Sequence, residues 1–390
     1  MINLLKKIKQ FLLKKTRLFL VEYQYPKHIF SKNVICKDEK HLEESIAWLC
    51  KAQDVTGCGG VSSHYDIATK KWGDPYRETT GYIIETLINH YHTTQKTELL
   101  ERAIKMGEWE ILVQCEDGSF GEVRKDGTIG KKVFNTGQVI IGLISLYKET
   151  RQMKYLESAE KAGQWLLKNQ ENDGSWDNFT TRGAKTYHSR VAWPLLLIFS
   201  LTKKIEYRNA AEKNITWVLA QQQDNYWFRN TSLSEKDEPW THLIAYTISG
   251  LIECYLLMEK PDERIFNAFY NSSNTILEIF KKNDYSFLPC SFDNNWRSND
   301  KYSCLTGDSQ LAIVWMQIYT MTKEKKFLEG AEKIIDLVKE TQIVETSDLN
   351  IKGGIFGSFP IHGEYAPFML INWAAKFFAD SLILKSKIKI

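Results

Sequence analysis

The chain lacks the features that mark several large classes of protein. Its seven cysteines form no C-x-x-C pair and are odd in number, which argues against a disulfide framework and a zinc knuckle. The net charge of +3 is too small to indicate a nucleic-acid-binding surface. No stretch approaches the ~18 consecutive apolar residues that a membrane-spanning helix requires. We therefore expect a cytoplasmic protein with no metal, no cofactor and no nucleic-acid partner.

The first 20 residues are rich in leucine and lysine. Leu5, Ile8 and Leu12 fall on one helical face, and the lysines among them interrupt any continuous apolar segment. A cleaved signal peptide is therefore not expected. A basic amphipathic helix can lie on an anionic membrane surface, which would place the protein peripherally on the inner membrane face. The alternative is a helix packed on the outside of the protein. Residues 1–40 are treated as an N-terminal extension.

A repeat runs through the rest of the chain. Four segments align without gaps, and each carries an alanine followed eleven positions later by a glutamine. The pairs are Ala103/Gln114, Ala159/Gln170, Ala211/Gln222 and Ala331/Gln342, and Gln53 ends a fifth, divergent copy. Successive glutamines are 61, 56, 52 and 120 residues apart, and the last interval is two periods with a degenerate copy near Lys282. The chain therefore has six units.

Each copy has the spacing of an amphipathic helix, as Leu156, Ala159, Gly163 and Leu166 show. A second helix, apolar nearly all round, precedes each copy and is expected to be buried on both sides. These inner helices are predicted at 79–93, 134–149, 188–202, 241–257, 306–321 and 367–384. Helical hairpins must stack to bury their faces. The repeat begins with an outer helix at 41–53 and ends with an inner one. The pattern therefore predicts an all-α (α/α)6 toroid over residues 41–386, closed by pairing of its two ends.

The segment from Lys161 to Trp176, KAGQWLLKNQENDGSW, resembles the Gln-Trp repeat of squalene-hopene cyclases and related α/α-toroid proteins, among them prenyltransferase subunits. The resemblance implies that the glutamine caps a helix while the tryptophan stacks, which ties neighbouring repeats together. The D-x-D-D and D-D-x-x-D acidic motifs of terpene enzymes are absent. The architecture also resembles the six-hairpin carbohydrate enzymes, which include unsaturated-uronyl hydrolases, sugar epimerases and polysaccharide lyases. That second resemblance implies an enzyme acting on a carbohydrate.

Polar residues gather where the inner helices begin, at the end of the ring where a cavity is expected. Buried polar groups without partners cost several kcal/mol, so these residues are candidates for function. The candidate catalytic residues are Glu78, Tyr187, His188, His242 and Asp308. The candidate substrate-binding residues are Tyr82, Gln138, Trp176, Arg190, Tyr246, Asn372 and Lys376.

Two chemistries fit this set. Removal of the C5 proton of a uronic acid needs a base, for which Tyr187, His188, His242 or Tyr246 are available, and Arg190 would neutralise the sugar carboxylate. Glycoside hydrolysis instead needs two carboxylates, for which Glu78 and Asp308 are the pair to test. Each residue also has a structural alternative, such as helix capping or a surface ion pair.

The leading hypothesis is an enzyme with lyase, epimerase or hydrolase activity. Its substrate would be a surface polysaccharide that contains uronic acid, or the precursor of such a polysaccharide. A toroid similar to the terpenoid cyclases that binds an isoprenoid is the second interpretation. A glycan-binding scaffold without catalysis is the third.

Overall fold

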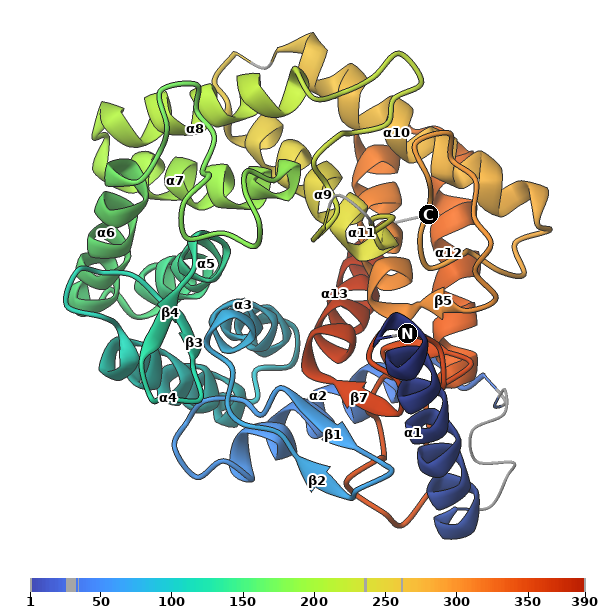
Figure 1. Cartoon of the computed structure of the whole chain (residues 1–390). Coiled ribbons are helices and arrows are strands. Elements are labelled where there is room, and N and C mark those ends of the chain that lie inside the picture. Colours follow the sequence, from blue (N-terminus) through green and yellow to red (C-terminus); the bar gives the residue numbers. More distant parts are fainter. Residues whose placement is uncertain (1, 26–32, 34, 235–236, 261, 389–390) are drawn as a thin grey trace.

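The computed structural model describes residues 2–25, 33, 35–234, 237–260 and 262–388. Its helices form a closed ring of two concentric layers (Figure 1). The inner layer consists of α3 (Arg77–Thr94), α5 (Val133–Thr150), α7 (Ser189–Thr202), α9 (Thr241–Leu257), α11 (Leu305–Thr322) and α13 (Asn372–Lys387). The outer layer consists of α2 (Asp38–Asp54), α4 (Thr97–Val113), α6 (Met153–Lys168), α8 (Ile205–Leu219), α10 (Glu263–Lys282) and α12 (Lys325–Thr341). The predicted all-α toroid of six hairpins is confirmed.

The ring closes where the two ends of the repeat meet. Helix α13 packs against α2 as its hairpin partner, and it also contacts α3 and α11 in the inner layer. The predicted inner helices are found within a few residues of their limits, although the last begins at Asn372 and not at 367. Residues 367–371 instead form a loop and a short strand.

The inner helices pack closely because small residues lie where they cross. A Cβ atom added at Gly142 on α5 would lie 2.0 Å from the carbonyl oxygen of Gly81 on α3. A Cβ atom at Gly81 would in turn lie 2.6 Å from the Cα atom of Val139. Glycine is therefore required at these crossings. The apolar residues around the glycines are buried on all sides, as expected for an inner helix that is covered by the outer layer and by its neighbours in the inner layer.

The repeated glutamines join neighbouring units, as the resemblance to the Gln-Trp repeat implied. The side-chain amide of Gln170 donates to the carbonyl of Gly174 in its own turn, at 3.0 Å, and to that of Ala210 on α8, at 2.9 Å. Gln342 makes the equivalent bonds across the closing seam, to the carbonyls of Gly353 (2.8 Å) and His41 (3.2 Å). Each glutamine thus satisfies buried backbone acceptors of two units at once.

Short strands in the loops between hairpins are the main departure from the sequence-based prediction. An antiparallel sheet has the order β2 (Lys71–Trp72), β1 (His64–Asp66), β7 (Met369–Ile371). Two smaller pairs join β3 (Gly121–Val123) to β4 (Ile129–Lys131) and β5 (Ser303–Cys304) to β6 (Ser358–Phe359). Segments of two or three residues are too short to show a strand periodicity.

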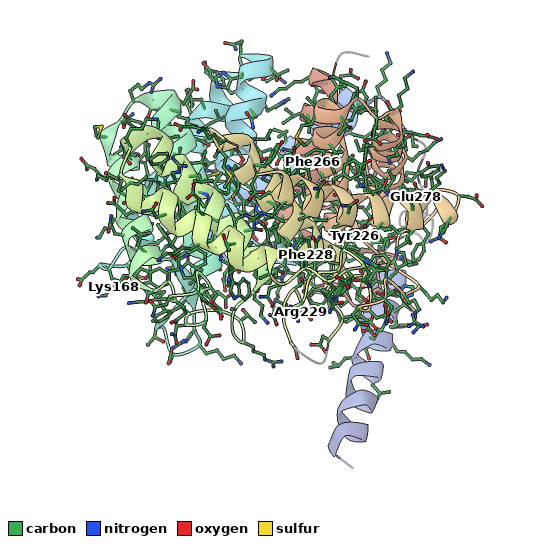
Figure 2. All side chains as sticks on the ribbon, turned by 90° about the horizontal axis from the view of Figure 1, so that it is seen from above. Lys168, Tyr226, Phe228, Arg229, Phe266 and Glu278 are labelled. Atoms are coloured by element: carbon green, nitrogen blue, oxygen red, sulfur yellow. The ribbon has the colours of Figure 1, made fainter. Side chains whose placement is uncertain are left out.

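Helix α1 (Ile2–Gln24) lies outside the ring and extends beyond its edge (Figure 2). Its C-terminal half contacts the ring: the guanidinium of Arg17 pairs with the carboxylate of Asp66 at 2.8 Å, and Val21 is buried. Residue 1 and the side chains of residues 2–11, on which the predicted membrane contact of residues 1–20 depends, lie outside what the structure describes. No helix in the described part of the chain is long and apolar enough to cross a membrane. The division at residue 40 stays a prediction.

Candidate functional site

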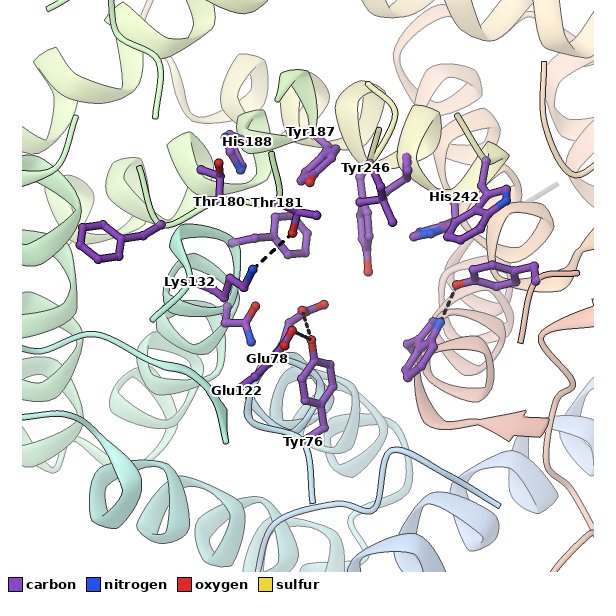
Figure 3. A pocket seen from close by; sticks show the side chains of 18 residues that line it. Tyr76, Glu78, Glu122, Lys132, Thr180, Thr181, Tyr187, His188, His242 and Tyr246 are labelled. Atoms are coloured by element: carbon purple, nitrogen blue, oxygen red, sulfur yellow. Dashed lines mark hydrogen bonds between the residues drawn. The ribbon is translucent and has the colours of Figure 1, made fainter. Parts of the chain in front are cut away.

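A cavity of about 270 Å³ opens at the end of the ring where the inner helices begin. Figure 3 shows side chains from several loops and inner helices that converge on it. Aromatic rings form much of its wall, namely Tyr76, Phe134, Phe179, Tyr187, Trp240, Tyr246, Tyr365 and Trp373. Its ionisable and polar groups are Glu78, Glu122, Lys132, Asn135, Thr180, Thr181, His188 and His242. Aromatic walls with a few convergent polar groups are typical of a small-molecule site.

Two carboxylates meet at one hydroxyl group in this cavity. The hydroxyl of Tyr76 lies 2.9 Å from Oε2 of Glu78 and 3.3 Å from Oε1 of Glu122. These two carboxylate oxygens are therefore at most about 6 Å apart, a limit that is compatible with the ~5–5.5 Å separation of the carboxyl groups in retaining glycosidases. All three side chains lie on one side of the cavity, opposite Tyr187 and Tyr246 (Figure 3).

Local structure holds this pair in place. Glu78 lies in the first turn of α3, and Tyr76 is the residue that precedes this helix. Glu122 is carried on β3, whose position relative to α3 is fixed by a hydrogen bond from the guanidinium of Arg77 to the carbonyl of Gly121, at 2.7 Å. A Cβ atom at Gly121 would lie 2.2 Å from the carbonyl oxygen of Gly130 on β4, so the hairpin requires glycine at this point.

Burial raises the pKa of Glu78 from its ordinary value of 4.5 to about 7. The hydrogen bond from Tyr76 lowers this pKa and the nearby charge of Glu122 raises it, but burial has the largest effect. The Tyr76 hydroxyl has one hydrogen, so it can donate to only one carboxylate at a time. The shorter of its two contacts is the hydrogen bond that it donates to Glu78, and burial still keeps the pKa of that carboxyl group near 7. Glu78 is therefore suited to hold a proton near neutral pH.

The histidines of the cavity and its residues Tyr187 and Tyr246 are neutral near pH 7. Burial lowers the pKa of His188 and of His242 to about 3. Burial raises the pKa of Tyr187 and of Tyr246 well above 10. A histidine with so low a pKa is a weak base, and a tyrosine with so high a pKa keeps its proton. The cavity thus contains one group, Glu78, whose raised pKa matches proton transfer at neutral pH.

Five of the predicted site residues line this cavity: Glu78, Tyr187, His188, His242 and Tyr246. Asp308, the predicted partner of Glu78, is not among the lining residues. It is buried on α11, where burial and the neighbouring Cys304 raise its pKa well above the ordinary range. The structure therefore does not bring Asp308 into this cavity beside Glu78, and its role as the second carboxylate stays a prediction.

Arg190, Lys376 and Gln138 lie deeper than expected. Arg190 and Lys376 line a second cavity at the opposite end of the inner helices. Gln138 holds Arg190 from both sides: its amide donates to the backbone carbonyl of Arg190 at 3.0 Å, and its oxygen accepts from Nε of Arg190 at 3.0 Å. The predicted contact of Arg190 with a substrate in the first cavity is therefore not supported, because its side chain is directed away from it.

The remaining three predicted residues make structural contacts. The ring nitrogen of Trp176 donates to the carbonyl of Leu166 at 2.9 Å, and the ring packs edge-on against His188. The amide of Asn372 donates to Thr79 Oγ1 at 2.8 Å, which joins α13 to α3. Tyr82 is fully buried against Phe377. None of the three lines the cavity, although Trp176 supports a residue that does.

Sequence reasoning missed Glu122 and Lys132. Both belong to the connection between α4 and α5, which has no helical periodicity to mark it. The one signal was position: Glu122 follows closely on the turn that ends the repeat unit of Gln114. Among the described residues, no group of three or more histidine, cysteine, aspartate or glutamate side chains is arranged to hold a metal ion.

The fold is an α/α toroid of six hairpins, the fold that six-hairpin glycosidases share. A family model described as the β-L-arabinofuranosidase GH127 catalytic domain matches residues 36–226, just under half of the chain. No curated protein sequence matches the chain.

Solved structures of carbohydrate enzymes resemble the whole ring. An unsaturated glucuronyl hydrolase from a Bacillus species, described as responsible for degradation of glycosaminoglycan, is 13% identical, with a TM-score of 0.70 over 90% of this chain and 97% of that one. The cellobiose 2-epimerase from Bacillus thermoamylovorans is 14% identical, with a TM-score of 0.69 over 88% and 97%. A sugar epimerase from a ruminal bacterium is 15% identical, with a TM-score of 0.71 over 90% and 99%. Together with the family model, these likenesses support an enzyme that acts on carbohydrates.

Proposed function

We propose that the protein is a glycoside hydrolase that removes a terminal sugar with retention of anomeric configuration. The observation that carries this proposal is the pair Glu78 and Glu122, both within 3.3 Å of the hydroxyl of Tyr76. Retaining hydrolysis requires one carboxyl group that is protonated and one that is ionised, close together. The raised pKa of Glu78 assigns the proton to that residue.

In the proposed reaction, Glu78 gives its proton to the leaving-group oxygen as the bond from that oxygen to C1 breaks. The carboxylate of Glu122 attacks C1 and forms a glycosyl ester. Glu78, now ionised, takes a proton from a water molecule, and this water attacks C1 and releases Glu122. Through its contacts with both carboxyl groups, the hydroxyl of Tyr76 keeps them in the same relative position during both steps.

The size and charge of the cavity indicate the substrate. A volume of about 270 Å³ is at the lower limit of the ~300–1,000 Å³ usual for ligand pockets, so a terminal sugar unit fits better than a longer stretch of polymer. Among the described residues that line the cavity, Lys132 is the one lysine or arginine, and its Nζ makes one long contact with them, of 3.5 Å to Thr181. A uronic acid carboxylate would give this ammonium a charged partner. The proposed substrate is therefore an oligosaccharide that ends in a uronic acid.

Elimination and epimerisation are less well supported by the cavity. Both require a base that removes a carbon-bound proton; His188 and His242 have too low a pKa to be strong bases, so Glu78 would have to take that proton as well. An isoprenoid would remove water from Glu78, Glu122 and Lys132 and offer them no polar group in exchange, which costs free energy. Action on a surface polysaccharide and contact of residues 1–20 with a membrane stay predictions.

The test is hydrolysis of a panel of short oligosaccharides that end in a uronic acid or in the matching neutral sugar. Released reducing sugar gives the rate, and proton NMR of the first product gives its anomeric configuration. Wild-type protein, Glu78→Gln, Glu122→Gln and the exposed control Glu157→Gln are compared. We expect release with retained configuration that both cavity variants abolish and the control does not. Inverted product, or equal rates in all four proteins, would refute the proposal.

A further inference from the structure

Helix α1 packs on the ring with one of its faces. Beside its ion pair with Asp66, the guanidinium of Arg17 donates to the carbonyl of Pro367 at 3.3 Å. Val21 and Tyr25 follow Arg17 at four-residue spacing and are buried in the same core. These contacts hold α1 on the connections that precede α3 and α13, at the end of the ring where the first cavity opens.

The opposite face of α1 carries apolar side chains that are exposed to solvent. Leu12 is 56% exposed, Phe19 is 65% exposed and Tyr23 is 82% exposed. Their spacing of seven and four residues places them on one side of the helix, about half a turn from the side that contacts the ring. The rings of Phe19 and Tyr23 stack with their centres 6.4 Å apart. We call Leu12, Phe19 and Tyr23 the apolar stripe.

Positive charge accompanies the apolar stripe. Lys14 and Lys15 are exposed on α1. Residues 2–25 contain one glutamate and six lysine or arginine residues, whereas the net charge of the whole chain is only +3, so basic residues are concentrated in this segment. Aligned apolar side chains in solvent indicate a binding surface, and lysines beside them indicate that its partner is negatively charged.

Two partners could cover the apolar stripe, and charge distinguishes them. A second copy of this chain would bring two sets of lysines together, and like charges repel. An anionic membrane offers both an apolar layer and negative headgroups, which is the combination that a basic amphipathic helix binds. The charge of α1 therefore favours the membrane.

We propose that α1 docks the protein on the surface of an anionic phospholipid membrane. The apolar stripe enters the boundary between headgroups and acyl chains, and Lys14 and Lys15 contact the negative headgroups. The helix extends beyond the edge of the ring, which leaves its N-terminal half open to approach (Figure 2). Docking through α1 brings the end of the ring that carries the first cavity close to the lipid, whatever reaction that cavity performs.

The test is co-sedimentation of the full chain with lipid vesicles. Vesicles that mix phosphatidylserine with phosphatidylcholine are compared with vesicles of phosphatidylcholine alone. We expect binding to the anionic vesicles to be at least about tenfold tighter than binding to the neutral ones. This binding should weaken as the salt concentration rises, because salt screens the attraction between lysines and headgroups.

Two double variants remove the two parts of the surface separately. Leu12→Ser/Phe19→Ser removes apolar area, and Lys14→Gln/Lys15→Gln removes two positive charges. Each should weaken binding to the anionic vesicles at least about tenfold, because both the buried apolar area and the lysines contribute to the affinity. All four side chains are exposed, so both variants should fold, and circular dichroism checks this. The second variant remains informative if the first is unfolded.

Matched control variants carry the same changes elsewhere on the surface. Leu112→Ser/Leu349→Ser changes two exposed leucines, and Lys281→Gln/Lys282→Gln changes two neighbouring exposed lysines on α10. Both controls should bind the anionic vesicles as the wild type does. A control that loses as much binding as the matching α1 variant would overturn the proposal.

Other results would also overturn it. These are no sedimentation with anionic vesicles, equal binding to both kinds of vesicle, and unchanged binding in the folded α1 variants. Sedimentation velocity without lipid tests the other partner. A wild-type dimer that Leu12→Ser/Phe19→Ser converts to a monomer would assign the apolar stripe to a second copy of the chain.

Discussion

Replacement of Glu78 by glutamine separates its proposed role in catalysis from its effect on stability. The folded protein holds the pKa of Glu78 at about 7, against an ordinary value of 4.5. The unfolded chain therefore ionises this group first, and the free energy of unfolding falls as pH rises from 4.5 to about 7. The accumulated cost above pH 7 is on the order of 3 kcal/mol. Glutamine has no such cost, so Glu78→Gln should unfold at a higher temperature than wild type at pH 8 and at nearly the same temperature at pH 4.

The same variant should lose activity while it gains stability. Loss of a general acid costs about 10²- to 10⁴-fold in rate. In the wild type, kcat/KM should fall as pH rises through about 7, because Glu78 then loses the proton it must donate. Glu78→Gln should lack this limb, and it should be least impaired on aryl glycosides whose leaving groups need no protonation. Thermal melts at two pH values and a pH-rate profile measure both effects. An unchanged pH profile in the variant, or a melting temperature that falls at pH 8, would refute the reasoning.

Three other substitutions test the site and the ring. Glu122→Gln should reduce hydrolysis of every substrate, activated or not, by at least about 100-fold, and burst kinetics should show no glycosyl-enzyme. Lys132→Met should raise KM roughly 10- to 100-fold for oligosaccharides that end in a uronic acid and leave the neutral analogues unchanged; equal effects on both would exclude charge recognition. Gln170→Leu leaves two carbonyls unpaired and should lower the free energy of unfolding in urea by about 1–3 kcal/mol, unlike a leucine at the exposed Glu171.

The ring was predictable because its information is periodic. A glutamine that must reach acceptors in two successive units recurs in the sequence at each unit that uses it. The helices of the inner layer are buried on most sides, so they must be apolar nearly all round. Both constraints leave a pattern that a single sequence reveals, including the degenerate copy that ends at Lys282 in α10. The position of the site at the inner-helix starts followed from the same pattern, and Glu78 and His242 were found in this way.

The partners of those residues were not predictable. Asp308 lies in the first turn of its helix, as Glu78 does, but its side chain is buried and is not among those that line the cavity. Glu122 comes from a hairpin whose path depends on a contact between Arg77 and the carbonyl of Gly121. Such a contact joins segments that are distant in the sequence, and no repeated sequence pattern predicts it.

The sequence by itself thus determined the architecture, the number of hairpins and the end of the ring at which the first cavity opens. Only the tertiary structure decided which carboxylates meet, that Arg190 belongs to a second cavity, and that burial gives Glu78 a pKa suited to proton transfer. The physical reason is that helix formation and layer burial depend on local and repeated patterns, whereas a catalytic pair depends on distances and solvent exclusion across the ring. These are set by the packing of all six hairpins together.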